Sequence, residues 1–204
     1  MGAIRTAAKT FLSKTDPSVY LALPRPIDPA DYELPELDGS GVPVAEIPLD
    51  GTKEDASPSV WAPRSLAASR EPLAPGFPDL RGVWEVYEGR MTGSVQRIEQ
   101  AGNRITITVG GLVHDMFCDG TLENGVDDIG GFSGSRIRVA ASREDGVHKL
   151  RPGGRRIVAV TRRLSDDGTE LLWRYGPGKN RCRRLTEVPM DHPPTRAAVE
   201  GAQA

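Results

Sequence analysis

The sequence has few of the residues from which metal, redox and aromatic-lined sites are built. Its 204 residues include two cysteines, Cys118 and Cys182, three histidines and 5% aromatic residues. Two cysteines without CxxC spacing do not make a zinc site. We expect both to be reduced thiols, joined in a disulfide only in an oxidising compartment.

Long apolar runs are also missing. No stretch approaches the ~20 apolar residues of a membrane-spanning helix. Residues 1–12 lack the continuous apolar region of a secretory signal. We therefore expect a cytoplasmic protein, whose membrane contact, if it has one, is peripheral to the inner membrane.

Motifs of common catalytic and metal sites are absent as well. No Gly-x-Ser-x-Gly or His-Glu-x-x-His pattern occurs. His114 and Asp115 are adjacent, so on a strand they point to opposite faces and cannot pair. Residues Asp119–Asp128 depart from the EF-hand order, which favours a polar turn. We predict a non-enzymatic protein without catalytic residues, cofactor or metal.

Residues 1–78 are rich in proline and form what we call the arm. They hold 12 of the 17 prolines, which exclude long helices and central strands and favour an extended course. Solvated linkers are poor in aromatic and branched apolar residues, yet the arm carries many. We predict that it lies along a surface, of a partner or of its own barrel. Its apolar anchors, which we expect to be exposed on an isolated monomer and to bind a partner, are Phe11, Tyr20, Leu23, Tyr32, Leu37, Ile47 and Trp61.

The first residues of the arm have a helical pattern of their own. Within residues 3–14, apolar side chains recur with the period of a helix. A helix this short is marginal alone. We expect either a short basic amphipathic helix, suited to a membrane surface or a protein groove, or a frayed terminus.

Residues 79–187 change to short alternating strands with turn signals, and residues 188–204 form a flexible tail. The clearest strand places Ile105, Ile107 and Val109 on one face and threonines on the other. We predict an all-β fold, a small antiparallel barrel of about eight strands, with Ile137 and Val139 also inward. The expected strands are Val83–Glu88, Ser94–Gln100, Arg104–Val109, Leu112–Phe117, Arg136–Ala141, Arg155–Leu164, Glu170–Tyr175 and Arg181–Leu185.

Charge is distributed unevenly along the chain. Residues 1–130 carry 11 Lys and Arg against 20 Asp and Glu, or −9, and residues 131–204 carry 15 against 8, or +7. The basic residues either keep outward strand positions soluble or form a face for an acidic protein or anionic membrane surface. For that face we name Arg155, Arg162 and Arg183. Aromatic residues do not interleave with the arginines, so we expect no nucleic-acid partner.

Gly82-Val83-Trp84 on the first barrel strand, with Arg181, Arg183 and Arg184 on the last, resembles the lipocalin-like (calycin) barrels over residues 80–186. The resemblance implies that Gly82 and Trp84 close one barrel end and that an arginine of the last strand packs across the indole. It also implies that the barrel binds a small apolar molecule, or acts as a cyclase or isomerase.

A second similarity lies in the arm. Leu34–Gly41, followed by Ile47-Pro48-Leu49, is similar to a stretch of the cytoplasmic part of the photosynthetic reaction-centre H subunit. It directs the choice of partner toward membrane-bound bioenergetic complexes.

Three functions remain from these observations: an accessory subunit, a ligand binder and a calycin-type enzyme. A ligand carrier does not need ~78 residues of anchored extension, and no acid–base pair supports an enzyme. The sequence therefore favours a non-catalytic accessory subunit that attaches to a larger, membrane-associated assembly through its arm and basic face. The alternative is an intracellular, lipocalin-like binder of a small apolar ligand.

Overall fold

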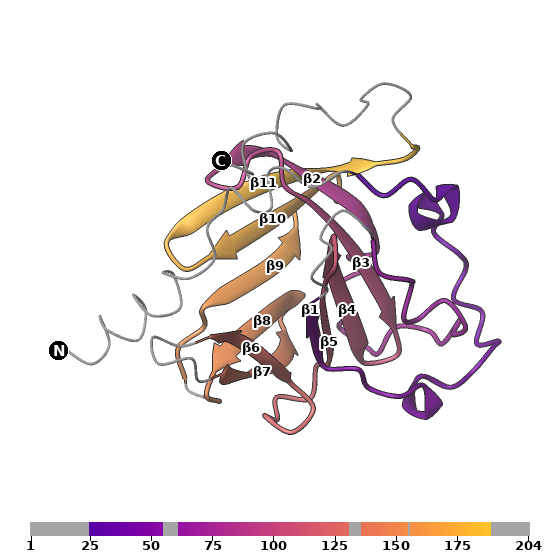
Figure 1. Cartoon of the computed structure of the whole chain (residues 1–204), viewed down its shortest axis with the longest axis horizontal. Coiled ribbons are helices and arrows are strands. Elements are labelled where there is room, and N and C mark those ends of the chain that lie inside the picture. The colour runs from indigo at the N-terminus through magenta and orange to yellow at the C-terminus, as the bar shows by residue number, and fades with distance from the viewer. Residues whose placement is uncertain (1–24, 55–60, 131–135, 155, 189–204) are drawn as a thin grey trace, which may run out of the picture.

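The computed structural model describes residues 25–54, 61–130, 136–154 and 156–188. In this part of the chain, eleven strands form one antiparallel sheet in the order β1-β5-β4-β3-β2-β11-β10-β9-β8-β7-β6 (Figure 1). Two short 3-10 helices, η1 (Pro29–Tyr32) and η2 (Val44–Glu46), lie in the arm. The strands are β1 (Thr52–Glu54), β2 (Gly82–Gly89), β3 (Val95–Ala101), β4 (Arg104–Val109), β5 (Leu112–Phe117), β6 (Val126–Gly130), β7 (Arg136–Glu144), β8 (Val147–Pro152), β9 (Val160–Leu164), β10 (Glu170–Tyr175) and β11 (Gly178–Leu185).

The sheet curls until its two ends nearly meet. Phe117 at the end of β5 donates its N–H to the carbonyl of Asn124, 2.9 Å away, just before β6. Asp119 forms an isolated bridge with Ser142 of β7. These contacts join the β5 side of the sheet to the β6–β7 side, so the molecule is a nearly closed antiparallel barrel (Figure 1). The predicted all-β barrel fold is confirmed.

Several strands match the sequence prediction and others were missed. The bounds of β4, β5 and β10 are those expected, and the segment predicted as Arg155–Leu164 is a strand only from Val160. The strands β1, β6 and β8 were not predicted. Their residues do not alternate clearly between apolar and polar types, so only pairing with neighbouring strands defines them.

The barrel interior is apolar in the way the alternation predicted. Ile105, Ile107 and Val139 are almost fully buried in the main core. Val109 is half-buried at the end of β4, and the side chain of Ile137 lies outside the described ones. The inward assignment is therefore confirmed for three of the five residues.

Trp84 is fully buried in the main core of the barrel. The guanidinium carbon of Arg184 lies 4.5 Å from the centre of its indole ring, which confirms the predicted packing of a last-strand arginine. Gly82 has a φ of +124°, and a Cβ there would lie 3.3 Å from Nη1 of Arg184. Glycine at this position therefore lets the arginine approach. Arg181, by contrast, is exposed and binds Glu170.

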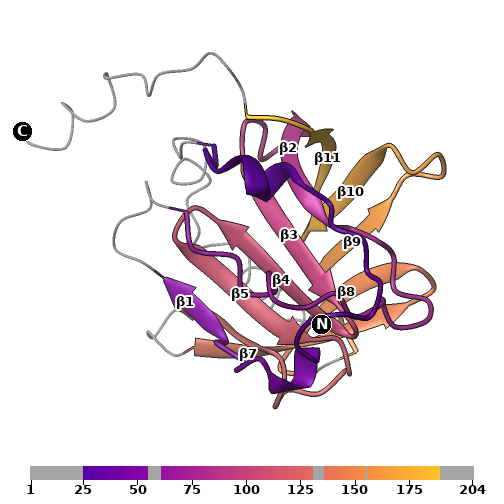
Figure 2. The same ribbon diagram turned by 90° about the vertical axis from the view of Figure 1, so that its right-hand side faces the viewer.

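The arm lies along the outside of its own barrel. Figure 2 shows it crossing in front of β3 and β4. Tyr32 is buried with Val83 and Val95, and Trp61 packs against them. Ile47 packs on a second small cluster that includes Ala101 of β3.

The expectation that the anchors are exposed on a monomer is therefore wrong for four of them. Tyr32 is buried, and Leu37, Ile47 and Trp61 are half-buried. The outer face of β2 and β3 offers apolar neighbours to Tyr32, Ile47 and Trp61. Phe11, Tyr20, Leu23, the helix expected over residues 3–14 and residues 189–204 of the tail lie outside the described residues.

Buried charges fasten the arm as well. Arg104 and Asp115 form an ion pair of 2.5 Å on the outer face of the barrel, with both side chains fully buried. Arg104 also donates to the carbonyls of Ile47, at 2.6 Å, and Pro48, at 2.7 Å. The backbone N–H of Asp50 donates to Asp115. The pair thus binds the arm to β4 and β5.

A second buried arginine does the same on β3. Arg97 pairs with Asp31 of the arm at 2.6 Å and donates to the carbonyl of Ala62, also at 2.6 Å. Glu99 accepts the backbone N–H groups of Ser65 and Leu66, and burial raises the pKa of its carboxyl. Buried hydrogen bonds therefore join the described arm to the barrel on β3 as well as on β4 and β5.

Candidate binding site inside the barrel

Three polar side chains stand side by side on neighbouring strands, and we call them the polar row. His148 of β8 pairs in register with Arg162 of β9, and Arg162 pairs with Trp173 of β10. Directly paired residues of antiparallel strands point to the same face. Trp173 belongs to the main core inside the barrel, so all three point into the interior.

Arg162 reaches across the barrel. Its Nε donates to Oε1 of Gln96 on β3 at 3.3 Å. Its guanidinium carbon lies 5.2 Å from the centre of the Trp173 ring, a cation–π distance. Gln96 in turn donates through Nε2 to Sγ of Cys182, 3.9 Å away. A permanent positive charge and two neutral polar groups thus lie together inside the barrel.

His148 and Trp173 have unsatisfied nitrogens. His148 is fully buried, and neither of its ring nitrogens has a hydrogen-bond partner in the protein. The indole N–H of Trp173 has none either. Burial, together with the charge of Arg162, lowers the pKa of His148 to about 3, so the imidazole is neutral near pH 7. Buried polar groups nearly always have partners, either in the protein or in ordered water, so these nitrogens make the polar row the candidate binding site.

Sequence reasoning misplaced part of this site. Arg162 was assigned to the basic outer face, but it is 6% exposed and points inward, because Val160 and Arg162 share the inner side of β9. His148 lies in β8, a strand that was not predicted from the sequence. The run Val147-His148-Lys149-Leu150 does not alternate between apolar and polar residues, so no local signal places His148 beside Leu150 on the inner face.

The other predicted basic residues have different surroundings. Arg183 is exposed and lies 2.6 Å from Glu85, which also binds Arg25 of the arm. Arg155 lies outside the described residues. The acidic partners neutralise part of the predicted basic face, and binding of a partner there stays a prediction.

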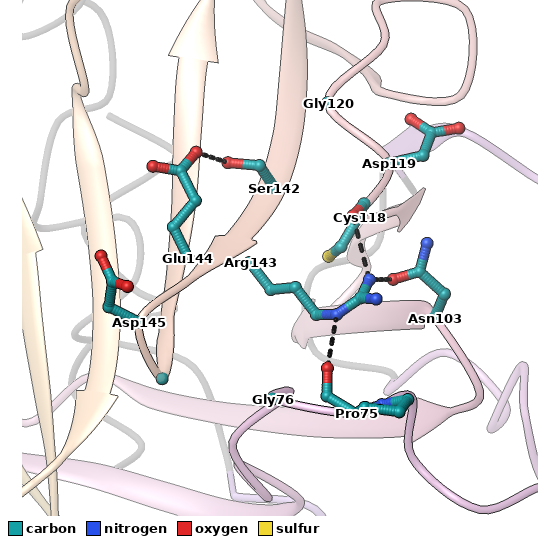
Figure 3. Close-up of a pocket in the computed structure, with 11 residues that line it drawn as sticks. Pro75, Gly76, Asn103, Cys118, Asp119, Gly120, Ser142, Arg143, Glu144 and Asp145 are labelled. Atoms are coloured by element: carbon teal, nitrogen blue, oxygen red, sulfur yellow. Dashed lines mark hydrogen bonds between the residues drawn. The ribbon is translucent and has the colours of Figure 1, made fainter.

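A hollow lies at the rim of the barrel (Figure 3). Arg143 points toward Asn103, to which it donates, and toward the carbonyl of Pro75 at 3.3 Å. Glu144 turns to Ser142. Hydrogen bonds, first from Arg151 and then from Lys149 and Ser142, lower the pKa of Glu144 to about 2. The protein itself satisfies these charged groups, so the hollow offers less for a ligand than the polar row.

The remaining reactive groups do not form a second site. Cys118 and Cys182 are free and buried. Burial raises the pKa of Cys118 and raises that of Cys182 to about 12, so neither is a thiolate nucleophile near neutral pH. Within residues 25–54, 61–130, 136–154 and 156–188, no three His, Cys, Asp or Glu side chains gather as metal ligands. No helix in these ranges is long and apolar enough to cross a membrane.

The chain has no significant similarity to any protein-family model, curated protein or solved structure.

Proposed function

We propose that this protein is a non-catalytic, lipocalin-like binder that holds a small, largely apolar molecule inside its barrel. The observation that carries the proposal is the polar row. The nitrogens of His148 and Trp173 face the interior without protein partners, beside the charged Arg162. Pockets for small molecules typically combine an apolar lining with a few polar groups that orient the ligand.

The number of strands in the sheet supports this use. An eight-stranded barrel is just filled by its own side chains, and the width grows with strand number. The sheet has eleven strands in the described part. Phe77, Leu80 and Trp84 pack into one end. Met91 lies in the turn after β2, at the opposite end, where it is only partly buried. We assign the entrance to that end.

The position of the arm supports a binder over an accessory subunit. The case for a partner depended on apolar anchors that a monomer would expose. Tyr32, Ile47 and Trp61 instead pack against the barrel. An arm that completes its own barrel gives the extension a purpose that requires no partner.

Extraction of the native protein tests the proposal. Full-length protein purified from its own cells should release one small organic molecule in near-stoichiometric amount, identified by mass spectrometry. An Ala141→Leu variant, which fills interior space beside the core, should release less of it. The matched Ala45→Leu variant alters an exposed arm position and should release as much as wild type. An empty wild-type protein, or equal loading of both variants, argues against the proposal.

A second candidate is the accessory subunit, and exposed apolar residues on the arm favour it. Ile27 is 83% exposed, and Leu34, Val42 and Leu49 are also exposed. Apolar patches of this kind often mark interaction sites. Leu34–Gly41 is also the segment similar to the reaction-centre H subunit, and this similarity is the only support for a photosynthetic, membrane-associated partner.

The two candidates are separated by surface variants. If the arm docks on an assembly, an Ile27→Ser/Leu34→Ser variant should lose a partner that wild-type protein retains in quantitative cross-linking from native membranes. Ile157→Ser removes a similarly exposed apolar side chain from the barrel and serves as the control. Loss of the partner with both variants, or with neither, removes the arm as its binding site.

A further inference from the structure

The connections between strands are basic at one end of the barrel. In an antiparallel sheet, successive connections lie at alternate ends. Those that follow β2, β4, β8 and β10 therefore share one end, which we call the basic end. In the described part of the chain, these four connections contain Arg90 and Arg156 and no Asp or Glu.

The opposite end, which we call the acidic end, has the reverse composition. The connections that follow β3, β5, β7 and β9 lie there, and their residues include no Lys or Arg in the described ranges. Surface carboxylates are ionised near pH 7, so this end is negatively charged. The acidic residues of these connections are Asp119, Glu123, Asp145, Asp166 and Asp167.

Two cations are directly opposed on the hairpin that reaches the basic end. Arg174 of β10 pairs in register with Lys179 of β11, and both side chains are exposed. Like charges directly opposite each other destabilise a sheet. Among the described residues, no carboxylate pairs with either of them, and Arg174 donates only to the neutral carbonyl of Val158, at 3.3 Å.

Arg90 brings a third cation to the same place. Its Cβ and Cδ lie 3.7 Å from the position that a Cβ on Gly178 would take, so the arginine packs beside the residue that precedes Lys179. Arg90 is exposed and has no ion pair with a described residue. By contrast, Arg163 and Arg183, which lie nearer the acidic end, have carboxylate partners. Positive charge without a described acidic partner therefore gathers at the turns after β2 and β10.

We propose that the basic end docks on an anionic membrane surface, with Arg90, Arg174 and Lys179 among the lipid headgroups. A bilayer that contains anionic lipids has a negative surface potential that attracts Lys and Arg, and its headgroups would relieve the repulsion between Arg174 and Lys179. The same surface repels the acidic end, so the charge distribution also orients the barrel. This contact is additional to the binding of a small molecule and does not depend on it.

The absence of a fixed geometry favours a membrane over an acidic protein. Arg97 and Arg104, which bind specific carboxylates, are buried and held by several hydrogen bonds. The side chains of Arg90 and Lys179 are exposed and have no such partners among the described residues. A diffuse negative surface attracts them in any orientation. The described connections at this end also lack aromatic residues, on which single-stranded nucleic acid would stack.

Vesicle flotation with the full-length protein tests the proposal. The probes are vesicles of phosphatidylcholine alone and vesicles of phosphatidylcholine mixed with phosphatidylglycerol. Wild-type protein should float with the mixed vesicles and not with the neutral ones, and added salt should weaken the binding. Soluble polyglutamate is the probe for an acidic protein partner and should bind more weakly than the mixed vesicles.

Exposed cations of the same sheet provide the matched variants. Arg174→Gln/Lys179→Gln should weaken binding to the mixed vesicles about 25-fold, because each cation near an anionic surface contributes about fivefold. Arg163→Gln/Arg183→Gln makes the same change in net charge nearer the acidic end and should weaken binding less than about fivefold. Residues 1–24 are present in wild type and in both variants, so any contribution they make cancels in the comparison.

Each outcome either supports the basic end or removes it. Equal loss with the two double variants shows that only net charge matters and overturns the docking face. Unchanged binding of Arg174→Gln/Lys179→Gln, or a wild-type protein that ignores the mixed vesicles, also overturns it. Tighter binding of polyglutamate identifies an acidic protein as the partner instead. None of these results bears on a ligand inside the barrel, which the extraction described above tests separately.

Discussion

Replacing Asp115 with asparagine should strongly destabilise the protein. Asp115 and Arg104 are both fully buried, 2.5 Å apart. The carboxylate accepts from Nε and Nη2 of Arg104, from the hydroxyl of Thr106 at 3.1 Å and from the N–H of Asp50 at 3.1 Å. Asparagine has nearly the same shape but no charge, and its amide places donor hydrogens where the carboxylate accepted.

The expected magnitude follows from the charge left behind. Removing one partner of a buried ion pair leaves an uncompensated buried charge and typically costs about 3–5 kcal/mol. Typical domains have a free energy of unfolding of about 5–15 kcal/mol. The variant should therefore lose a large share of its stability, with the arm detaching from β4 and β5, because Arg104 also holds the carbonyls of Ile47 and Pro48.

Urea unfolding followed by circular dichroism measures this loss. Asp166→Asn is the control, because Asp166 pairs with Arg163 at 3.5 Å on the surface, with its side chain fully exposed, where a pair contributes about 0–1 kcal/mol. Removing both charges of the buried pair, in an Arg104→Met/Asp115→Leu variant, should recover part of the loss. A loss below about 1 kcal/mol for Asp115→Asn, similar to the control, would refute the reasoning that the pair fastens the arm.

Three further changes test the interior, the contact at Gly82 and the buried histidine. Ile107→Ala should lower the free energy of unfolding by about 2–5 kcal/mol, because Ile107 is 2% exposed in the core; a loss under about 0.5 kcal/mol, typical of surface sites, would place it outside. Gly82→Ala should lower the melting temperature, because the glycine has a φ of +124° and lies against Arg184, whereas Gly39→Ala, with open space around it, should lower it less. Since the pKa of His148 is about 3 when folded and about 6.5 when unfolded, the unfolded state binds an extra proton between these values. Wild-type stability should therefore fall as pH drops from 6.5 toward 3, by at most about 1.4 kcal/mol per pH unit from this residue. In urea titrations His148→Phe should show a shallower dependence, and an unchanged slope would contradict a buried, neutral histidine.

The sequence by itself determined the class of fold. Ile105, Ile107 and Val139 alternate with polar residues, and a period of two leaves a strand only one apolar face to bury. The packing of a last-strand arginine on Trp84 was implied by the resemblance to lipocalin-like barrels, because the two residues are far apart in the chain. The alternation is local, so it can be read from neighbouring residues.

Only the tertiary structure decided where the arm lies and what the interior contains. The Arg104–Asp115 pair and the anchor Tyr32 are buried by contacts with segments far away in the chain. A local sequence pattern cannot predict which distant residue will pair with a buried charge. The polar row depends on strand register, because one residue of slip moves every side chain to the other face. The sequence therefore left Arg162 on the outside, and pairing with His148 and Trp173 placed it within the barrel.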